Sequence, residues 1–246
     1  MGPPTESQQG SPAGDAHNGP TLERNLRALE RTSPDAVAAI RSAAPHAGVE
    51  WIDTPEGPSA TIRSGTSGPH GTQRALASKR GPRTEAARLA ERVDIAASPG
   101  LVVLGFGLGL HVEAIGDRLK KTGVMLVFEP DVALLRTVFE RIDCSAWLAE
   151  TNVALLIDPE DAGAVHRAIR GVEGVVASGV AMVEHPPSVP RLGKTAAQFG
   201  ETISLVLKGL KTTVVTTLMQ AEVTRAGARP SPRRSRRHLR HPGSPG

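Results

Sequence analysis

A glycine-rich turn between two apolar runs constrains the fold of this chain more than any other feature. Residues 101–104 form an apolar run that enters a Gly-x-Gly-x-Gly turn, and a helix-like segment continues to about Lys121. A second apolar run, residues 124–128, ends at Glu129. The order strand, glycine turn, helix and strand ending in an acid is typical of the first half of a nucleotide-binding α/β domain.

The same turn indicates where a ligand would bind. A helix that starts directly after a glycine turn points its free N–H groups and its positive dipole end toward an anion such as a phosphate. Glu129 follows Gly107 by 22 residues, close to the spacing at which such folds place an acid on a ribose hydroxyl. We therefore predict that a cofactor is bound by Gly105, Gly107, Gly109, His111 and Glu129.

The kind of ligand stays open at this point. The dinucleotide fingerprint reads G-x-G-x-x-G, and here the third glycine comes one residue early. The G-x-G-x-G form is closer to methyltransferase-type sites for S-adenosylmethionine. The remaining alternative is a tight turn that binds no ligand.

Alternating strand and helix patterns define the expected fold class and organisation. They predict an α/β, Rossmann-like fold whose mostly parallel sheet carries helices on both faces, preceded by a small α+β segment. Residues 1–20 and the basic tail 225–246 are rich in Pro, Gly and Ser and are expected to be disordered. Between them lie a helical and α+β segment, the Rossmann-like core and a C-terminal helix, at residues 21–98, 99–189 and 190–224.

Individual elements follow from local patterns. Helices are expected over residues 21–30, 34–44, 84–97, 130–142 and 160–170. Strands are expected over 49–52, 60–62 and 153–157, with a strand or strand pair over 175–183 that is broken at Gly179 and a loop over 64–73. Thr21 and Ser33 are expected to cap the first two helices. Val214, Val215, Leu218 and Met219 would form an apolar face on the last helix.

The net charge of +4 comes from the C-terminal tail. Seven arginines follow Glu222 with no acid among them, and subtracting seven from +4 leaves −3 for the rest of the chain. The body therefore gives no reason to expect nucleic-acid binding. The tail permits three interpretations: a solvated basic tail, a contact to nucleic acid or anionic membrane, or a segment read out of frame.

Cysteine usage and terminal composition favour a cytoplasmic protein. Cys144 is the single cysteine, so no internal disulfide forms, and we expect it to be a packing residue. The N-terminus has no basic start and no apolar core, unlike a secretory signal. No apolar run reaches the ~18 residues that span a bilayer.

Three motifs together resemble the N-terminal domain of the motility accessory factor (Maf) glycosyltransferases. Ser78, Pro82, Glu85 and Ala86 match a Ser-x-x-x-Pro-x-x-Glu-Ala element. Gly105, Gly107, Leu108, Gly109 and His111 match a Gly-x-Gly-Leu-Gly-Tyr-His turn, in which Leu110 replaces the usual tyrosine. Glu129, Pro130 and Asp131 match a strand ending in Glu-Pro-Asp, and Asn25 and Leu26 suit the family's leading helix. The resemblance covers roughly residues 21–222.

The resemblance implies a role in bacterial surface glycosylation. Family members transfer a nonulosonic acid from a CMP-sugar to Ser or Thr of flagellin, in a following domain related to sialyltransferases and 6-hydroxymethylpterin diphosphokinase-like proteins. That domain is absent here, so we expect a non-catalytic N-terminal module, truncated before the catalytic domain. Its partners would be flagellin or a separate catalytic domain, and a CMP-sugar becomes a second candidate ligand beside S-adenosylmethionine.

Two other hypotheses remain beside the module: a methyltransferase-type enzyme, and a structural remnant without ligand. Glu113 and Glu129 are the carboxylates that could act as acid or base, and His111 could donate to a phosphate. Glu184 and His185 precede two prolines, which favours a structural turn. The sequence has no Asp-x-Asp, no Lys/Arg cluster beside the glycine turn and no metal-ligand spacing, so we assign no catalytic and no metal residues.

Overall fold

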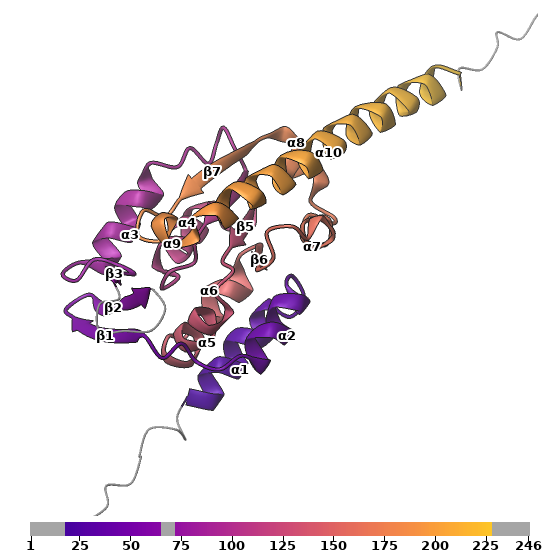
Figure 1. Cartoon of the computed structure of the whole chain (residues 1–246). Coiled ribbons are helices and arrows are strands. Elements are labelled where there is room, and N and C mark those ends of the chain that lie inside the picture. The colour runs from indigo at the N-terminus through magenta and orange to yellow at the C-terminus, as the bar shows by residue number, and fades with distance from the viewer. Residues whose placement is uncertain (1–17, 65–71, 228–246) are drawn as a thin grey trace, which may run out of the picture.

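A four-stranded parallel sheet forms the centre of the molecule. The computed structural model describes residues 18–64 and 72–227. The strands are β4 (Gly100–Leu104), β5 (Val124–Phe128), β6 (Val153–Leu156) and β7 (Val180–Glu184), in the order β6-β5-β4-β7. Every neighbouring pair is parallel (Figure 1). The predicted Rossmann-like α/β fold class is therefore confirmed.

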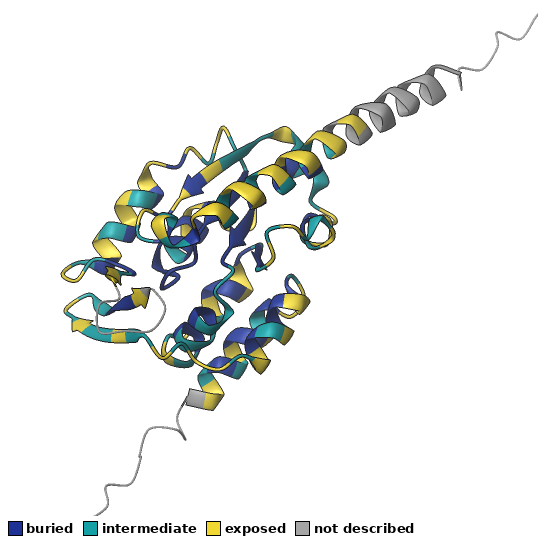
Figure 2. Ribbon diagram, in the orientation of Figure 1, coloured by how far each residue is buried: buried dark blue, intermediate teal, exposed yellow. Residues whose placement is uncertain are grey.

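Helices cover both faces of this sheet. Successive strand residues point to opposite sides, and the residues on both sides are apolar. Leu101 and Val103 of β4 face α1 (Asn18–Leu29), α2 (Pro34–Ser42), α3 (Pro82–Glu91), α4 (Leu110–Leu119), α5 (Val132–Arg141) and α6 (Ser145–Glu150). Val102 and Leu104 face α7 (Ala162–Ala168), α8 (Glu173–Ser178) and α10 (Lys194–Gly227). Figure 2 shows the buried residues concentrated between these layers.

A small antiparallel sheet lies on the N-terminal side, as expected. It consists of β1 (Val49–Thr54), β2 (Gly57–Ser64) and β3 (Thr72–Ala75). β1 and β2 form a hairpin in which Thr54 pairs with Gly57. The loop expected over residues 64–73 is wrong at its ends, because Ser64 pairs with Thr72 and extends the sheet.

Several predicted boundaries differ from the structure. The expected strand over 175–183 is helical in its first part, since α8 continues to Ser178 and only Val180–Glu184 is a strand. The helix expected over 84–97 ends at Glu91. The first helix begins at Asn18, so Thr21 lies within it and is not its cap.

Ser33 precedes α2 as predicted, but its side chain serves another element. Its Oγ accepts a hydrogen bond from the backbone N–H of Leu155 at 2.7 Å and makes no cap bond to α2. Leu155 lies in β6, an edge strand of the parallel sheet. Ser33 therefore satisfies a backbone donor that no neighbouring strand pairs.

The C-terminal helix is long and only partly packed on the body. A short helix, α9 (Val189–Leu192), leads into α10, whose Phe199, Ile203 and Val206 are buried on the sheet. The far part of α10 extends away from the body (Figure 1). The disorder predicted for residues 1–20 and 225–246 is wrong at residues 18–20 and 225–227, which belong to α1 and α10. The rest of those two predicted segments, and the side chains of the expected apolar face at residues 214–219, lie outside what the structure describes. Across the described ranges, no helix has the length and apolar character needed to span a bilayer.

Candidate functional site

The predicted glycine turn joins β4 to α4. Its three glycines are buried and have positive φ angles: +96° at Gly105, +52° at Gly107 and +80° at Gly109, the residue before α4. L-residues rarely adopt such angles, so the turn requires glycine for its backbone conformation.

The segment that follows β7 fills the space over this turn. A Cβ atom built on Gly105 would overlap the side chain of Ser188, and one on Gly107 would lie 2.7 Å from Cε1 of His185. The backbone N–H of His185 donates to the carbonyl oxygen of Leu104 at 3.1 Å, which fixes the segment at the end of β4. Because glycine has no side chain, residues 185–188 of the same chain can pack directly against the turn.

Glu129, the predicted ribose-binding acid, is buried and bound to an arginine. Its Oε1 accepts a hydrogen bond from Nη1 of Arg191 at 2.8 Å, and its Oε2 accepts one from Nη2. Backbone N–H groups of Phe106 and Asp131 also donate to it, at 3.2 and 3.1 Å. Glu129 is 0% exposed and the Arg191 side chain 9%. Its carboxylate is therefore saturated by partners within the chain.

Arg191 is the charged residue that sequence reasoning missed. It lies in α9, 62 residues after Glu129, and no local pattern connects the two positions. The sequence shows no Lys/Arg cluster beside the glycine turn, and the single arginine that binds Glu129 comes from a distant segment. The arginine reaches the turn because β7 runs parallel to β4 and delivers residues 185–192 to the same end of the sheet.

His111 and His185 stack on each other beside the turn. Their ring centroids are 3.9 Å apart and their planes differ by 9°, and both residues are buried. His111 Nε2 lies 2.9 Å from the carbonyl oxygen of Gly105. Because a carbonyl only accepts, His111 carries its proton on Nε2. His185 Nδ1 lies 2.8 Å from Oγ of Ser188.

Both histidines are uncharged at neutral pH. Burial lowers the pKa of His111 from 6.5 to about 4. Burial, together with the nearby His111 and Arg191, lowers the pKa of His185 to about 2. Imidazolium ions would lose their hydration at these positions without gaining a carboxylate partner. The pair therefore packs as two neutral rings.

A pocket of about 560 Å³ opens beside the stacked histidines. Its wall includes Glu56, residues 76–78 and 80–82, part of α3 up to Arg92, and Pro186 and Pro187. Leu108, Leu110 and His111 complete it from the side of the glycine turn. Of the five predicted cofactor residues, His111 alone lines this pocket. Gly105, Gly107, Gly109 and Glu129 are buried outside its wall.

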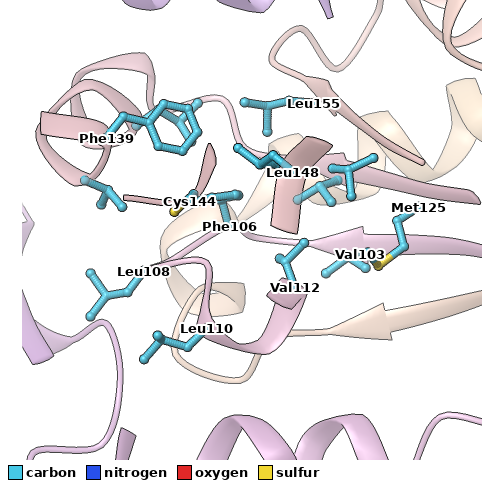
Figure 3. Packing of buried hydrophobic residues seen from close by; sticks show 14 of the residues in the cluster. Val103, Phe106, Leu108, Leu110, Val112, Met125, Phe139, Cys144, Leu148 and Leu155 are labelled. Carbon is cyan, nitrogen blue, oxygen red and sulfur yellow. The ribbon is translucent and has the colours of Figure 1, made fainter. Parts of the chain in front are cut away.

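The other candidate side chains are paired, packed in the core or exposed outside the pocket. Glu113 is half-buried and pairs with Arg83 at 3.3 Å. Cys144 packs among Phe106, Leu148 and their neighbours (Figure 3), and burial raises the pKa of its thiol to about 12. Glu184 is exposed at the end of β7. Within residues 18–64 and 72–227, no three His, Cys, Asp or Glu side chains are placed to hold a metal ion.

Comparison with known protein families, curated proteins and solved structures finds no match.

The buried histidines should make stability depend on pH. Both pKa values are depressed in the folded chain, so below pH 6.5 the unfolded chain binds protons that the folded chain does not. We expect the free energy of unfolding to fall between pH 6.5 and 5, by about 1.4 kcal/mol per pH unit for each histidine. Urea denaturation across this range measures the slope.

His111→Gln is the matched variant for this test, because its amide can still donate to the Gly105 carbonyl but does not titrate. In this variant the free energy of unfolding should change less steeply with pH, by the contribution of one titrating group, about 1.4 kcal/mol per pH unit. An unchanged slope would mean that His111 titrates normally in the folded chain.

Proposed function

We propose that this chain is a non-catalytic module of a Maf-type protein glycosyltransferase, acting in the cytoplasm on the glycosylation of flagellin or another surface protein with nonulosonic acids. The three motifs behind the resemblance lie far apart in sequence but meet in space. Ser78 donates its backbone N–H to Glu85 at 2.6 Å, and both residues line the pocket that His111 also lines. Glu129 binds the backbone of the same glycine turn, at Phe106.

The Glu129–Arg191 pair supports a non-catalytic role. An acid that binds a ribose needs free carboxylate oxygens at the end of its strand. Here both oxygens are held by a buried guanidinium and two backbone N–H groups. The chemistry of sugar transfer, with its CMP-sugar donor, is therefore assigned to a separate catalytic domain, with which this module and flagellin would associate.

The methyltransferase alternative requires S-adenosylmethionine to occupy the glycine turn. The side chains of His185 and Ser188 already lie against Gly107 and Gly105. Binding would have to displace residues 185–192 and separate a buried ion pair, at an expense of several kcal/mol. The geometry thus favours the module over this enzyme.

Deleting the encoding gene in its host should abolish nonulosonic acid on flagellin. Intact-protein mass spectrometry of purified filaments measures this, and the wild-type gene supplied in trans should restore the modified mass. An unaltered glycan mass in the deletion strain would contradict the proposed function.

Calorimetric titration with S-adenosylmethionine separates the two candidates in vitro. We expect no saturable heat with the full chain. Saturable binding, together with methyl transfer to any acceptor, would replace the module with the methyltransferase alternative.

A further inference from the structure

The pocket beside α3 has the dimensions of a small-molecule site. Its volume of about 560 Å³ falls within the range of roughly 300–1,000 Å³ that is typical of ligand pockets. Leu89, Leu108, Leu110 and Pro187 give it apolar wall on two sides. These walls suit the organic part of a ligand larger than a simple ion.

Three arginines line the same pocket and have no side-chain partner within the described part of the chain. Arg80 precedes α3, Arg88 lies in it, and Arg92 directly follows its last residue. Arg88 and Arg92 are four residues apart, and Arg92 keeps a helical backbone conformation, so both lie on one side of the helix. All three are exposed, and among the described residues none of their guanidinium groups makes a hydrogen bond or ion pair. Arg83 on the same helix differs, because it pairs with Glu113.

Among the described residues, the carboxylates of the pocket form no ion pair with these arginines. Glu85 accepts the backbone N–H of Ser78 at 2.6 Å. Glu56 accepts the backbone N–H and the hydroxyl of Thr84 at 2.9 and 2.6 Å, at the start of α3. Both acids thus serve the local backbone, and the guanidinium groups remain free to bind an anion.

The histidine side of the pocket supplies a neutral acceptor. His111 donates from Nε2 to the Gly105 carbonyl, and its other ring nitrogen, Nδ1, has no hydrogen-bond partner within the described part of the chain. His111 lines the pocket, and an unprotonated ring nitrogen can accept from a ligand hydroxyl without adding charge.

We propose that this pocket binds a small phosphate ester, with its phosphate held by Arg80, Arg88 and Arg92 and its organic part against Leu108 and Leu110. Guanidinium groups bind phosphate oxygens in a bidentate fork. Three guanidinium groups that form no ion pair with Glu56 or Glu85 match a dianionic phosphate better than a singly charged carboxylate. No sequence motif predicted this site, since its arginines become neighbours of His111 only through packing of α3 on α4.

Calorimetric titrations of the full chain test the proposal with three probes: glucose 6-phosphate, inorganic phosphate and glucuronate. We expect glucose 6-phosphate to bind with a Kd of about 1 mM or lower, and inorganic phosphate to compete with it. Glucuronate, of similar size but with a carboxylate, should bind at least about tenfold more weakly. The double variant Arg88→Gln, Arg92→Gln should weaken glucose 6-phosphate binding by about tenfold or more.

Arg27→Gln is the matched control, because Arg27 is also an exposed helical arginine but lies on α1, outside the pocket wall. It should bind like the wild type, and all variants should melt at the wild-type temperature. The seven arginines after Glu222 remain in every variant, so phosphate binding through them would survive the double substitution. Such survival, equal binding of glucuronate, or no binding of either phosphate probe at about 10 mM would each overturn the proposal.

Discussion

Arg191→Met should lower the free energy of unfolding by about 3–5 kcal/mol, because it leaves Glu129 as a buried charge without its partner. Glu129 is fully buried, and two backbone N–H groups cannot replace the lost guanidinium. Methionine fills much of the same volume, so the change in packing is small. Urea denaturation at pH 7 measures the loss.

The double variant Glu129→Gln, Arg191→Met separates the pair from its surroundings. Glutamine keeps the size of the side chain without its charge, so the double variant should be more stable than Arg191→Met alone. Arg167→Met is the matched control, since Arg167 pairs with Asp35 and Asp161 at the surface. Its denaturation midpoint should stay close to that of the wild type. Equal losses for Arg191→Met and Arg167→Met would show that the buried pair contributes nothing special.

Gly105→Ala should destabilise the fold by about 2–5 kcal/mol. Part of the loss, about 1–2 kcal/mol, comes from placing alanine at a positive φ. The rest comes from overlap between the new methyl group and the side chain of Ser188. Thermal or urea denaturation of the purified variant gives the size of the loss.

Gly171→Ala provides the control for backbone strain alone. Gly171 has a φ of +83°, close to the +96° of Gly105, but a Cβ there would meet no atom within 4 Å. We expect it to lose only about 1–2 kcal/mol. If both variants lose the same amount, residues 185–188 do not occupy the turn in solution, and the turn becomes available to a ligand again.

Local signals were sufficient for most of the fold. Strands β4 and β5 are short, continuous apolar runs bounded by glycine or an acid, and the residues before α5 and α7 are aspartates. Asp131 and Asp161 accept the N–H groups of Leu134 and Ala164, as helix caps do. Such features depend on residues within a few positions, so the sequence alone indicates them.

The error at residues 175–178 has a physical cause. Val175 and Val176 are β-branched and continue an apolar run toward β7, which is a typical strand pattern. A short apolar run does not distinguish a strand from a buried helical turn. Here Val176 packs in the core that α10 also contributes to, and this tertiary contact favours the helix.

The candidate site could be predicted only in part for a similar reason. The glycine turn, His111 and Glu129 were found because they form a local motif. The residues that occupy this turn and bind Glu129 are His185, Ser188 and Arg191. They belong to the segment after β7, which lies beside β4. The spacing between the glycine turn and Glu129 is compatible both with an acid that binds a ribose and with an acid in an internal ion pair. Only the three-dimensional arrangement distinguishes these two roles.

The position of β7 also governs the order in which the chain can fold during synthesis. β4 needs β7 as its second neighbour, and the two strands begin 80 residues apart, at Gly100 and Val180. Glu129 leaves the ribosome well before Arg191. Because its partner is not yet synthesised, the carboxylate of Glu129 must stay hydrated until residues 185–192 join the sheet. Long-range closures of this kind come late and leave partly formed sheets exposed to aggregation. The nascent chain therefore depends on residues 185–192 to complete its core. A ribosome that stalls before them would carry an incomplete sheet whose apolar residues and strand edge are exposed to aggregation.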